Sequence, residues 1–208
     1  MEIGVISFTE NGKKLSERVF TGWKPECVFL YTKCKIESER DTQQKETFVQ
    51  SVEGDTAGWT GEQFAAGRAL VFIGACGIAV RMIAPFVRDK LTDSPVIVLD
   101  EAGQFVIPIL SGHVGGANEL AMRIAEAAGA VPVLTTATDV NRTFAADLFA
   151  KQQKLTIQNK EGIARVSSKI LAGKMADIVI ATDEKTLSKG ILRLKPKEYT
   201  LGSGCRRG

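Results

Sequence analysis

The segment FVIPILSGHVGGANELAMRIAEAAG, residues 105–129, decides the fold of this 208-residue chain. Its first six residues are apolar and predict a strand, three glycines follow within five residues, and a helical pattern then runs to Gly129. The only histidine, His113, lies in the turn. A glycine-rich turn between strand and helix lets a ligand approach the backbone and leaves the first helical N–H groups free for an anion. The turn therefore predicts a binding site.

The same strand–turn–helix unit recurs nearer the amino terminus. Residues 69–73 form an apolar run, residues 74–77 a glycine turn and residues 78–84 a helical pattern. Further apolar runs at 2–7, 27–31, 95–99 and 130–134 predict strands, and residues 100–103 predict a hairpin-like turn before the run that ends at Leu110. Nearly continuous apolar strands that alternate with helices indicate an α/β fold with a mainly parallel, doubly wound sheet.

The chain is predicted to divide into a larger and a smaller part. Residues 1–140 form an amino-terminal α/β domain that carries the glycine turns, and residues 141–198 a second, smaller α/β domain with helices near 144–149 and over 163–171. Residues 199–208 resemble a strand entering a glycine turn with no helix after it, which suggests a truncated chain or a detached partner module. The polar segment 33–55 reads as an exposed connection or solvated helix, with a functional lid as the alternative.

Composition excludes several functional classes. The apolar fraction of 44% and the charged fraction of 25% match a globular protein, and a net charge of +3 without a Lys/Arg block argues against a nucleic-acid partner. No apolar run approaches the roughly 18 residues that span a bilayer, and no signal peptide is apparent. The four cysteines have no CxxC spacing, which disfavours a metal site. We therefore expect a cytoplasmic protein without a membrane partner.

Three turns carry the candidate site, namely residues 74–77, 111–118 and 135–139. Each follows a predicted strand, and ligands of open α/β sheets bind outside the carboxyl ends of the strands, so we expect the three turns to face one crevice. Acid–base chemistry near neutral pH favours a histidine, which makes His113 the catalytic candidate. A structural histidine is the alternative.

The other polar residues of these turns each have two interpretations. Ser111 suits a turn or capping hydroxyl, and Cys76 either a nucleophile at a helix amino terminus or a buried structural thiol. Thr135, Thr136 and Thr138 could bind carboxylates or cap the next helix. Asp139 could cap that helix or orient a histidine, and Arg81 could bind a carboxylate or lie on a solvated face. No dinucleotide or Walker motif follows the glycines, which disfavours a nucleotide-binding domain.

Five segments carry a further pattern, namely residues 77–85, 89–93, 98–103, 111–121 and 135–139. Taken in order, they resemble the CbiG family, the cobalt-precorrin-5A hydrolases of anaerobic cobalamin (vitamin B12) synthesis, most strongly over residues 60–140. By the same resemblance, residues 199–208 look like the start of that family's carboxyl-terminal domain, which is missing here. The resemblance implies a carbon–carbon bond hydrolase that opens the δ-lactone of a cobalt corrinoid and releases acetaldehyde. Cobalt would arrive inside the substrate, so no cofactor and no metal site of the protein's own is expected.

The resemblance also suggests roles for individual residues. His113 would be the base, and the N–H groups of Gly115 and Gly116 would stabilise the oxyanion. The expected substrate-binding residues are Gly74, Gly77, Arg81, Ser111, Gly115, Gly116, Asn118, Thr135, Thr136, Thr138 and Asp139. The competing hypothesis is a non-catalytic corrinoid-binding or tetrapyrrole-binding module whose chemistry needs the missing domain. A dimer partner is a further candidate for completing the site.

Overall fold

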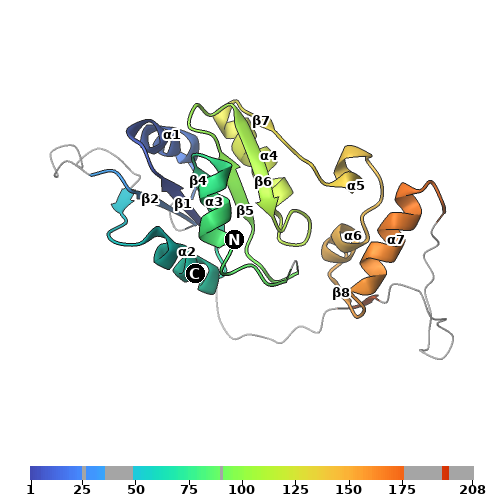
Figure 1. The fold of residues 1–208 in the computed structure, drawn as a ribbon. Helices are drawn as coiled ribbons and strands as arrows, with labels where there is room; N and C mark the ends of the chain where they lie inside the picture. The colour runs from blue at the N-terminus through green and yellow to red at the C-terminus, as the bar shows by residue number, and fades with distance from the viewer. Residues whose placement is uncertain (25–26, 36–48, 90, 176–193, 197–208) are drawn as a thin grey trace, which may run out of the picture. The chain divides into compact units, whose positions relative to one another are not determined.

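The computed structural model describes residues 1–24, 27–35, 49–89, 91–175 and 194–196. The chain separates into two compact units, residues 1–135 and residues 136–208 (Figure 1). The first unit contains the turn around His113 and is built on one sheet.

That sheet has seven strands in the order β3-β2-β1-β4-β5-β6-β7. The strands are β1 (Ile3–Ser7), β2 (Val28–Thr32), β3 (Val49–Ser51), β4 (Ala69–Ile73), β5 (Val96–Leu99), β6 (Phe105–Leu110) and β7 (Val131–Pro132). Strands β1 to β5 all run parallel, β6 runs antiparallel to β5, and β7 runs parallel to β6. The predicted mainly parallel sheet is confirmed, with its last two strands reversed.

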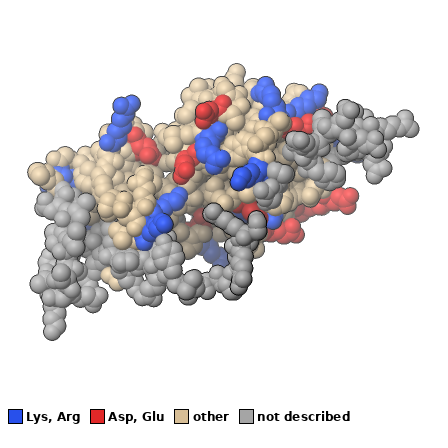
Figure 2. All heavy atoms as spheres, turned by 180° about the vertical axis from the view of Figure 1, so that it is seen from behind, with Lys and Arg blue, Asp and Glu red and all other residues tan. Residues whose placement is uncertain are grey.

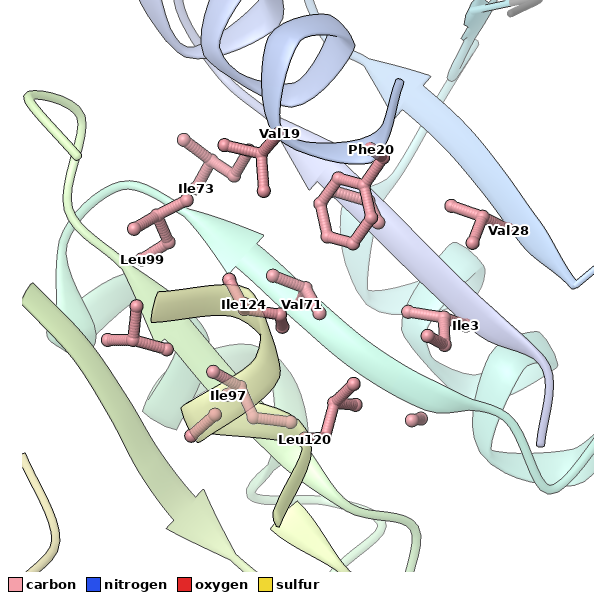
Figure 3. Close-up of a cluster of buried hydrophobic side chains, with 14 of the residues drawn as sticks. Ile3, Val19, Phe20, Val28, Val71, Ile73, Ile97, Leu99, Leu120 and Ile124 are labelled. Atoms are coloured by element: carbon pink, nitrogen blue, oxygen red, sulfur yellow. The ribbon is translucent and has the colours of Figure 1, made fainter. Parts of the chain in front are cut away.

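Four helices cover both faces of this sheet. Helices α1 (Glu10–Phe20) and α4 (Ala117–Ala128) pack on one face, and α2 (Thr56–Ala65) and α3 (Cys76–Ile83) on the other. The first layer is drawn in Figure 3, where Val19 and Phe20 of α1 and Ile124 of α4 lie over the strands. The second layer contains Trp59 of α2 and Ala79 of α3. Strands buried from both sides explain why their sequences are continuous apolar runs.

Local signals set the ends of these helices. The Thr9 hydroxyl accepts the N–H of Gly12 at 3.0 Å and caps α1. Gly129 ends α4 with φ 69°, a left-handed conformation that glycine adopts without strain, as the sequence predicts. Pro108 of β6 lies two residues beyond the last β7 partner, next to the register shift between β5 and β6, which is where a residue without an N–H is tolerated.

Two strand predictions differ from the structure. Residues 49–51 belong to the segment expected to be a connection or solvated helix, but they form the edge strand β3, which pairs with β2. The strand expected at 130–134 is shorter and forms only β7. The hypothesis of a lid within 33–55 depends on residues 36–48, which lie outside the described residues.

The second unit contains α5 (Ala137–Val140), α6 (Ala146–Gln152), β8 (Leu155–Ile157), α7 (Glu161–Leu171) and β9 (Leu194–Pro196). Strands β8 and β9 pair antiparallel, and α6 and α7 are the helices expected near 144–149 and over 163–171. The terminal turn expected at 199–208 lies outside the described residues. Within the described part of the chain, no helix combines the length and apolarity needed to cross a membrane.

Candidate functional site

The reversal of β6 separates two turns that were expected to share a crevice. Leu110, the last residue of β6, pairs with Val96 at the start of β5, and Val96 pairs with Leu70 at the start of β4. The His113 turn therefore leaves the sheet where β4 and β5 begin, whereas Gly74 follows the end of β4. The two positions are separated by the length of β4, about 16 Å at the usual rise per residue. The prediction of one crevice for residues 74–77 and 111–118 is wrong.

The Gly74 turn lies where β1 and β4 end, which is the topological switch point of the sheet. A Cβ at Gly74 would lie 3.4 Å from Cδ2 of Phe8, the residue that follows β1. Cys76, the first residue of α3, is half-buried against the apolar layer under α2 and α3, as expected of a structural thiol. Arg81 is exposed on the same helix. Gly74, Gly77 and Arg81 therefore belong to a different edge from His113.

The His113 turn is closed by its own backbone. The N–H of Ala117 donates to the Ser111 carbonyl at 3.1 Å, and the N–H of Asn118 donates to the Gly112 carbonyl at 3.0 Å. The expectation that the first helical N–H groups are free for an anion is therefore wrong for these two groups. Ser111 has φ 55° and Gly116 has φ 91°, so the backbone passes through the left-handed region at both ends of the turn.

Close packing explains two of the three glycines in this turn. A Cβ at Gly112 would lie 2.6 Å from Oδ1 of Asn118, and a Cβ at Gly115 would lie 2.5 Å from Cβ of Ser111. Asn118 is only 7% exposed, so its amide packs inside the turn. This burial favours a structural role for Asn118 beside its predicted role in substrate binding. His113 itself is half-buried.

A second loop supports the turn from the side. The Ser111 hydroxyl donates to the Asp93 carbonyl at 2.8 Å and so links the turn to this loop. Asp93 in turn accepts the N–H groups of Arg88 and Asp89 on its carboxylate. Asp93 was not among the site residues inferred from the sequence, because a contact across 18 positions leaves no periodic signal. Its place in a segment that resembles the CbiG family was the only indication.

The third turn divides between the two units. Thr135 is exposed and follows β7, which runs parallel to β6, so it continues toward the edge that carries His113. Thr136, Thr138 and Asp139 belong to the second unit, where Thr136 precedes α5 without a side-chain cap and Thr138 is 7% exposed. A shared site between these three residues and His113 stays a prediction.

One face of the molecule carries charges of both signs. On the face drawn in Figure 2, Lys and Arg side chains are interspersed with Asp and Glu. Among the residues that the structure describes, no group of three or more His, Cys, Asp or Glu side chains could hold a metal ion. An anionic ligand would therefore be met by local donors.

The first unit is a doubly wound α/β domain with glycine-rich turns at both edges of its sheet, and in open α/β sheets ligands bind at the loops beyond the strands. Residues 58–139, which include both turns, match the family model described as Cobalamin synthesis G N-terminal. The resemblance inferred from the motifs is confirmed over these residues, which are similar to the amino-terminal domain of the CbiG family.

Three curated relatives have related names. A cobalt-precorrin-5A hydrolase of Priestia megaterium is 32% identical over 185 residues, covering 89% of this chain and 48% of the relative. A cobalt-precorrin-5A hydrolase of Salmonella typhimurium is 53% identical over 100 residues, 48% of this chain and 28% of the relative. A probable cobalt-precorrin-5A hydrolase of Methanocaldococcus jannaschii is 24% identical, covering 100% of this chain and 62% of the relative. The chain thus spans less than two thirds of each relative's length.

Among solved structures, the chain is similar to a putative cobalamin biosynthesis protein G homolog from Sulfolobus solfataricus. The sequence identity is 20% and the TM-score 0.47, with 94% of this chain and 60% of the other covered.

Proposed function

We propose that this chain acts in anaerobic cobalamin biosynthesis by hydrolysing cobalt-precorrin-5A. In this proposal the δ-lactone opens, acetaldehyde is released, and cobalt-precorrin-5B is formed. The observation that carries the proposal is the family match over residues 58–139, because it encloses the sole histidine and the whole of its turn. The names of the three relatives support the same activity.

The chemistry assigns a role to each part of the His113 turn. Lactone opening requires an activated water to attack the acyl carbon and donors to stabilise the oxyanion that forms. In the proposal His113 removes a proton from water, and the N–H groups of Gly115 and Gly116 face the oxyanion. The backbone bonds that Ala117 and Asn118 donate within the turn would hold these groups in a fixed arrangement. Preorganised donors of this kind require no rearrangement during the reaction.

The substrate is proposed to bind at the edge that carries His113, with Thr135 as a hydroxyl donor to a carboxylate arm. Roles of Thr136, Thr138 and Asp139 in substrate binding stay predictions from the sequence. Gly74, Gly77 and Arg81 are not proposed to touch the ring beside His113, because they lie at the opposite edge of the sheet. Cobalt is proposed to enter as part of the substrate.

The test is anaerobic incubation of the chain with cobalt-precorrin-5A and measurement of acetaldehyde. The expected result is acetaldehyde release by the wild type and a large loss of rate in His113→Ala. Arg123→Ala, an exposed substitution on α4 outside the turn, is the control and should retain the wild-type rate. A His113→Ala variant that releases acetaldehyde at the wild-type rate would remove His113 from the mechanism.

A second candidate function is corrinoid binding without catalysis by this chain alone. In this alternative the glycine turns only hold carboxylates of the ring, and the chemistry needs a further domain. Absorbance titration distinguishes the two functions. Spectral changes of the corrinoid without acetaldehyde release would support the binding module, and release would support the hydrolase.

A further inference from the structure

The loop that precedes β5 is closed by two aspartates. Oδ2 of Asp93 accepts the N–H of Arg88 at 2.9 Å and the N–H of Asp89 at 3.0 Å. The N–H of Asp93 donates back to the Asp89 carbonyl at 2.8 Å, and Oδ1 of Asp89 accepts the N–H of Leu91 at 2.9 Å. Several bonds between the two ends of a short loop restrict its conformations. Asp93, the shared partner, is therefore held in a defined position.

Ser111 connects this loop to the His113 turn. Its hydroxyl donates to the Asp93 carbonyl at 2.8 Å, its carbonyl accepts the N–H of Ala117, and its Cβ lies against Gly115. Its φ of 55° is uncommon for a residue with a side chain, and such conformations persist only where the surroundings hold them. The bond to Asp93 is one of the contacts that hold it, two residues before His113.

We propose that Asp93 is a positioning residue for His113, and that it acts through Ser111 by fixing the entry of the turn. The proposal assigns Ser111 a linking role in place of the direct substrate contact expected from the sequence. Its catalytic consequence rests on the proposed function, whereas the positioning itself can be measured without substrate.

A role in general stability is the competing explanation, and the chain offers a matched control for it. Asp100, at the other end of β5, likewise closes a turn by accepting backbone N–H groups, from Ala102 at 2.9 Å, from Gln104 at 2.8 Å and from Phe105. The two aspartates thus have similar bonds, but Asp100 lies at the edge opposite to His113. An effect confined to Asp93 would come from the His113 turn and not from the loss of a turn carboxylate.

The sole histidine serves as the spectroscopic probe. In the full chain, without a histidine tag and with labelled histidine, the NMR spectrum contains the imidazole signals of His113 alone. Asp93→Ala is expected to shift and broaden these signals, and Asp93→Asn, which keeps an oxygen acceptor, to restore them. Ser111→Ala removes only the link to Asp93 and should shift them in the same way, which covers the case in which Asp93→Ala does not fold. Asp100→Ala should leave them unchanged.

The proposal is overturned if the imidazole signals are unchanged in folded Asp93→Ala and Ser111→Ala, or if Asp100→Ala shifts them equally. Turnover of cobalt-precorrin-5A gives the second readout. Because a displacement of about 1 Å can lower a rate by about a hundredfold, Asp93→Ala should reduce kcat at least about tenfold with KM little changed. Asp100→Ala should keep the wild-type kcat.

The two readouts separate this proposal from the proposed function. A wild type that releases no acetaldehyde contradicts the hydrolase, while the NMR comparison still decides whether Asp93 positions His113. A shifted imidazole signal with unchanged kcat would overturn the catalytic consequence.

Discussion

A Gly115→Ala substitution places a methyl group inside the His113 turn. The new Cβ would lie 2.5 Å from Cβ of Ser111 and 2.7 Å from the Ser111 carbonyl oxygen, both far inside van der Waals contact. Neither atom moves when the Ser111 rotamer changes, because the backbone fixes the position of Cβ as well as that of the carbonyl oxygen. The turn has to open, and the Ser111 carbonyl, which accepts the N–H of Ala117, has to move with it.

The expected loss of stability follows from these two contributions. Overpacking of a well-packed site costs about 1–3 kcal/mol, and a weakened backbone hydrogen bond adds about 1 kcal/mol. The free energy of unfolding should therefore fall by about 2–4 kcal/mol. For a chain of this size that corresponds to a decrease in Tm of about 5–15 °C.

Thermal and urea denaturation followed by circular dichroism measure this loss. The matched control is Gly77→Ala, at the second position of α3, where no atom lies within 4 Å of the new Cβ. Alanine is preferred to glycine in helices by up to about 1 kcal/mol, so the control should unfold at the wild-type temperature or above it. If Gly115→Ala has the same Tm as the wild type, the turn is not packed as described.

Three further predictions concern the frame around the site. Thr9→Ala removes the cap of α1 and should lower the free energy of unfolding by about 1 kcal/mol in urea denaturation; an unchanged midpoint would contradict the capping role. Ile124→Ala, at a fully buried position of α4, should lower the free energy of unfolding by about 2–5 kcal/mol. Met122→Ala, at a position 48% exposed on the same helix, should change it by no more than about 0.5 kcal/mol, and equal losses would refute the assigned helix face. Gly61→Ala places a Cβ 2.9 Å from the Phe86 ring and should lower the free energy of unfolding by about 1 kcal/mol despite the gain in helix propensity. In a double-mutant cycle, the same substitution in the Phe86→Leu background should cause no such loss.

The direction of β6 illustrates how much of the fold can be predicted from the sequence. The apolar run 105–110 and the hairpin-like turn before it could be read directly, and a tight turn between two strands requires them to run antiparallel. Reversal of β6 then moves the His113 turn to the edge where β4 and β5 begin. The hairpin-like turn therefore predicts the edge of the sheet at which His113 lies. The apolar pattern of a strand does not by itself indicate the direction in which the strand runs.

The sequence predicts the His113 turn itself but not the contacts from other segments that hold the turn. Three glycines around a single histidine mark the turn: Gly112 and Gly115 leave no space for a Cβ beside Asn118 and Ser111, and Gly116 has a left-handed φ of 91°. The bond from Ser111 to Asp93 joins residues 18 positions apart and depends on how β5 and β6 pair. The edge strand β3 was missed for a related reason. Its three residues, Val49–Ser51, are mostly polar and exposed, so pairing with β2 rather than an apolar pattern defines them.

The central place of β1 has a consequence for synthesis of the chain. Ile3 pairs with Val28 on one side and with Ala69 on the other, so β1 leaves the ribosome before both of the strands that flank it in the finished sheet. Strand β2 soon covers one side, but about 40 further residues must be translated before β4 can cover the other, about 2–8 s at ordinary elongation rates. During that interval an apolar strand has one unpaired edge, the kind of surface on which nascent chains associate with one another.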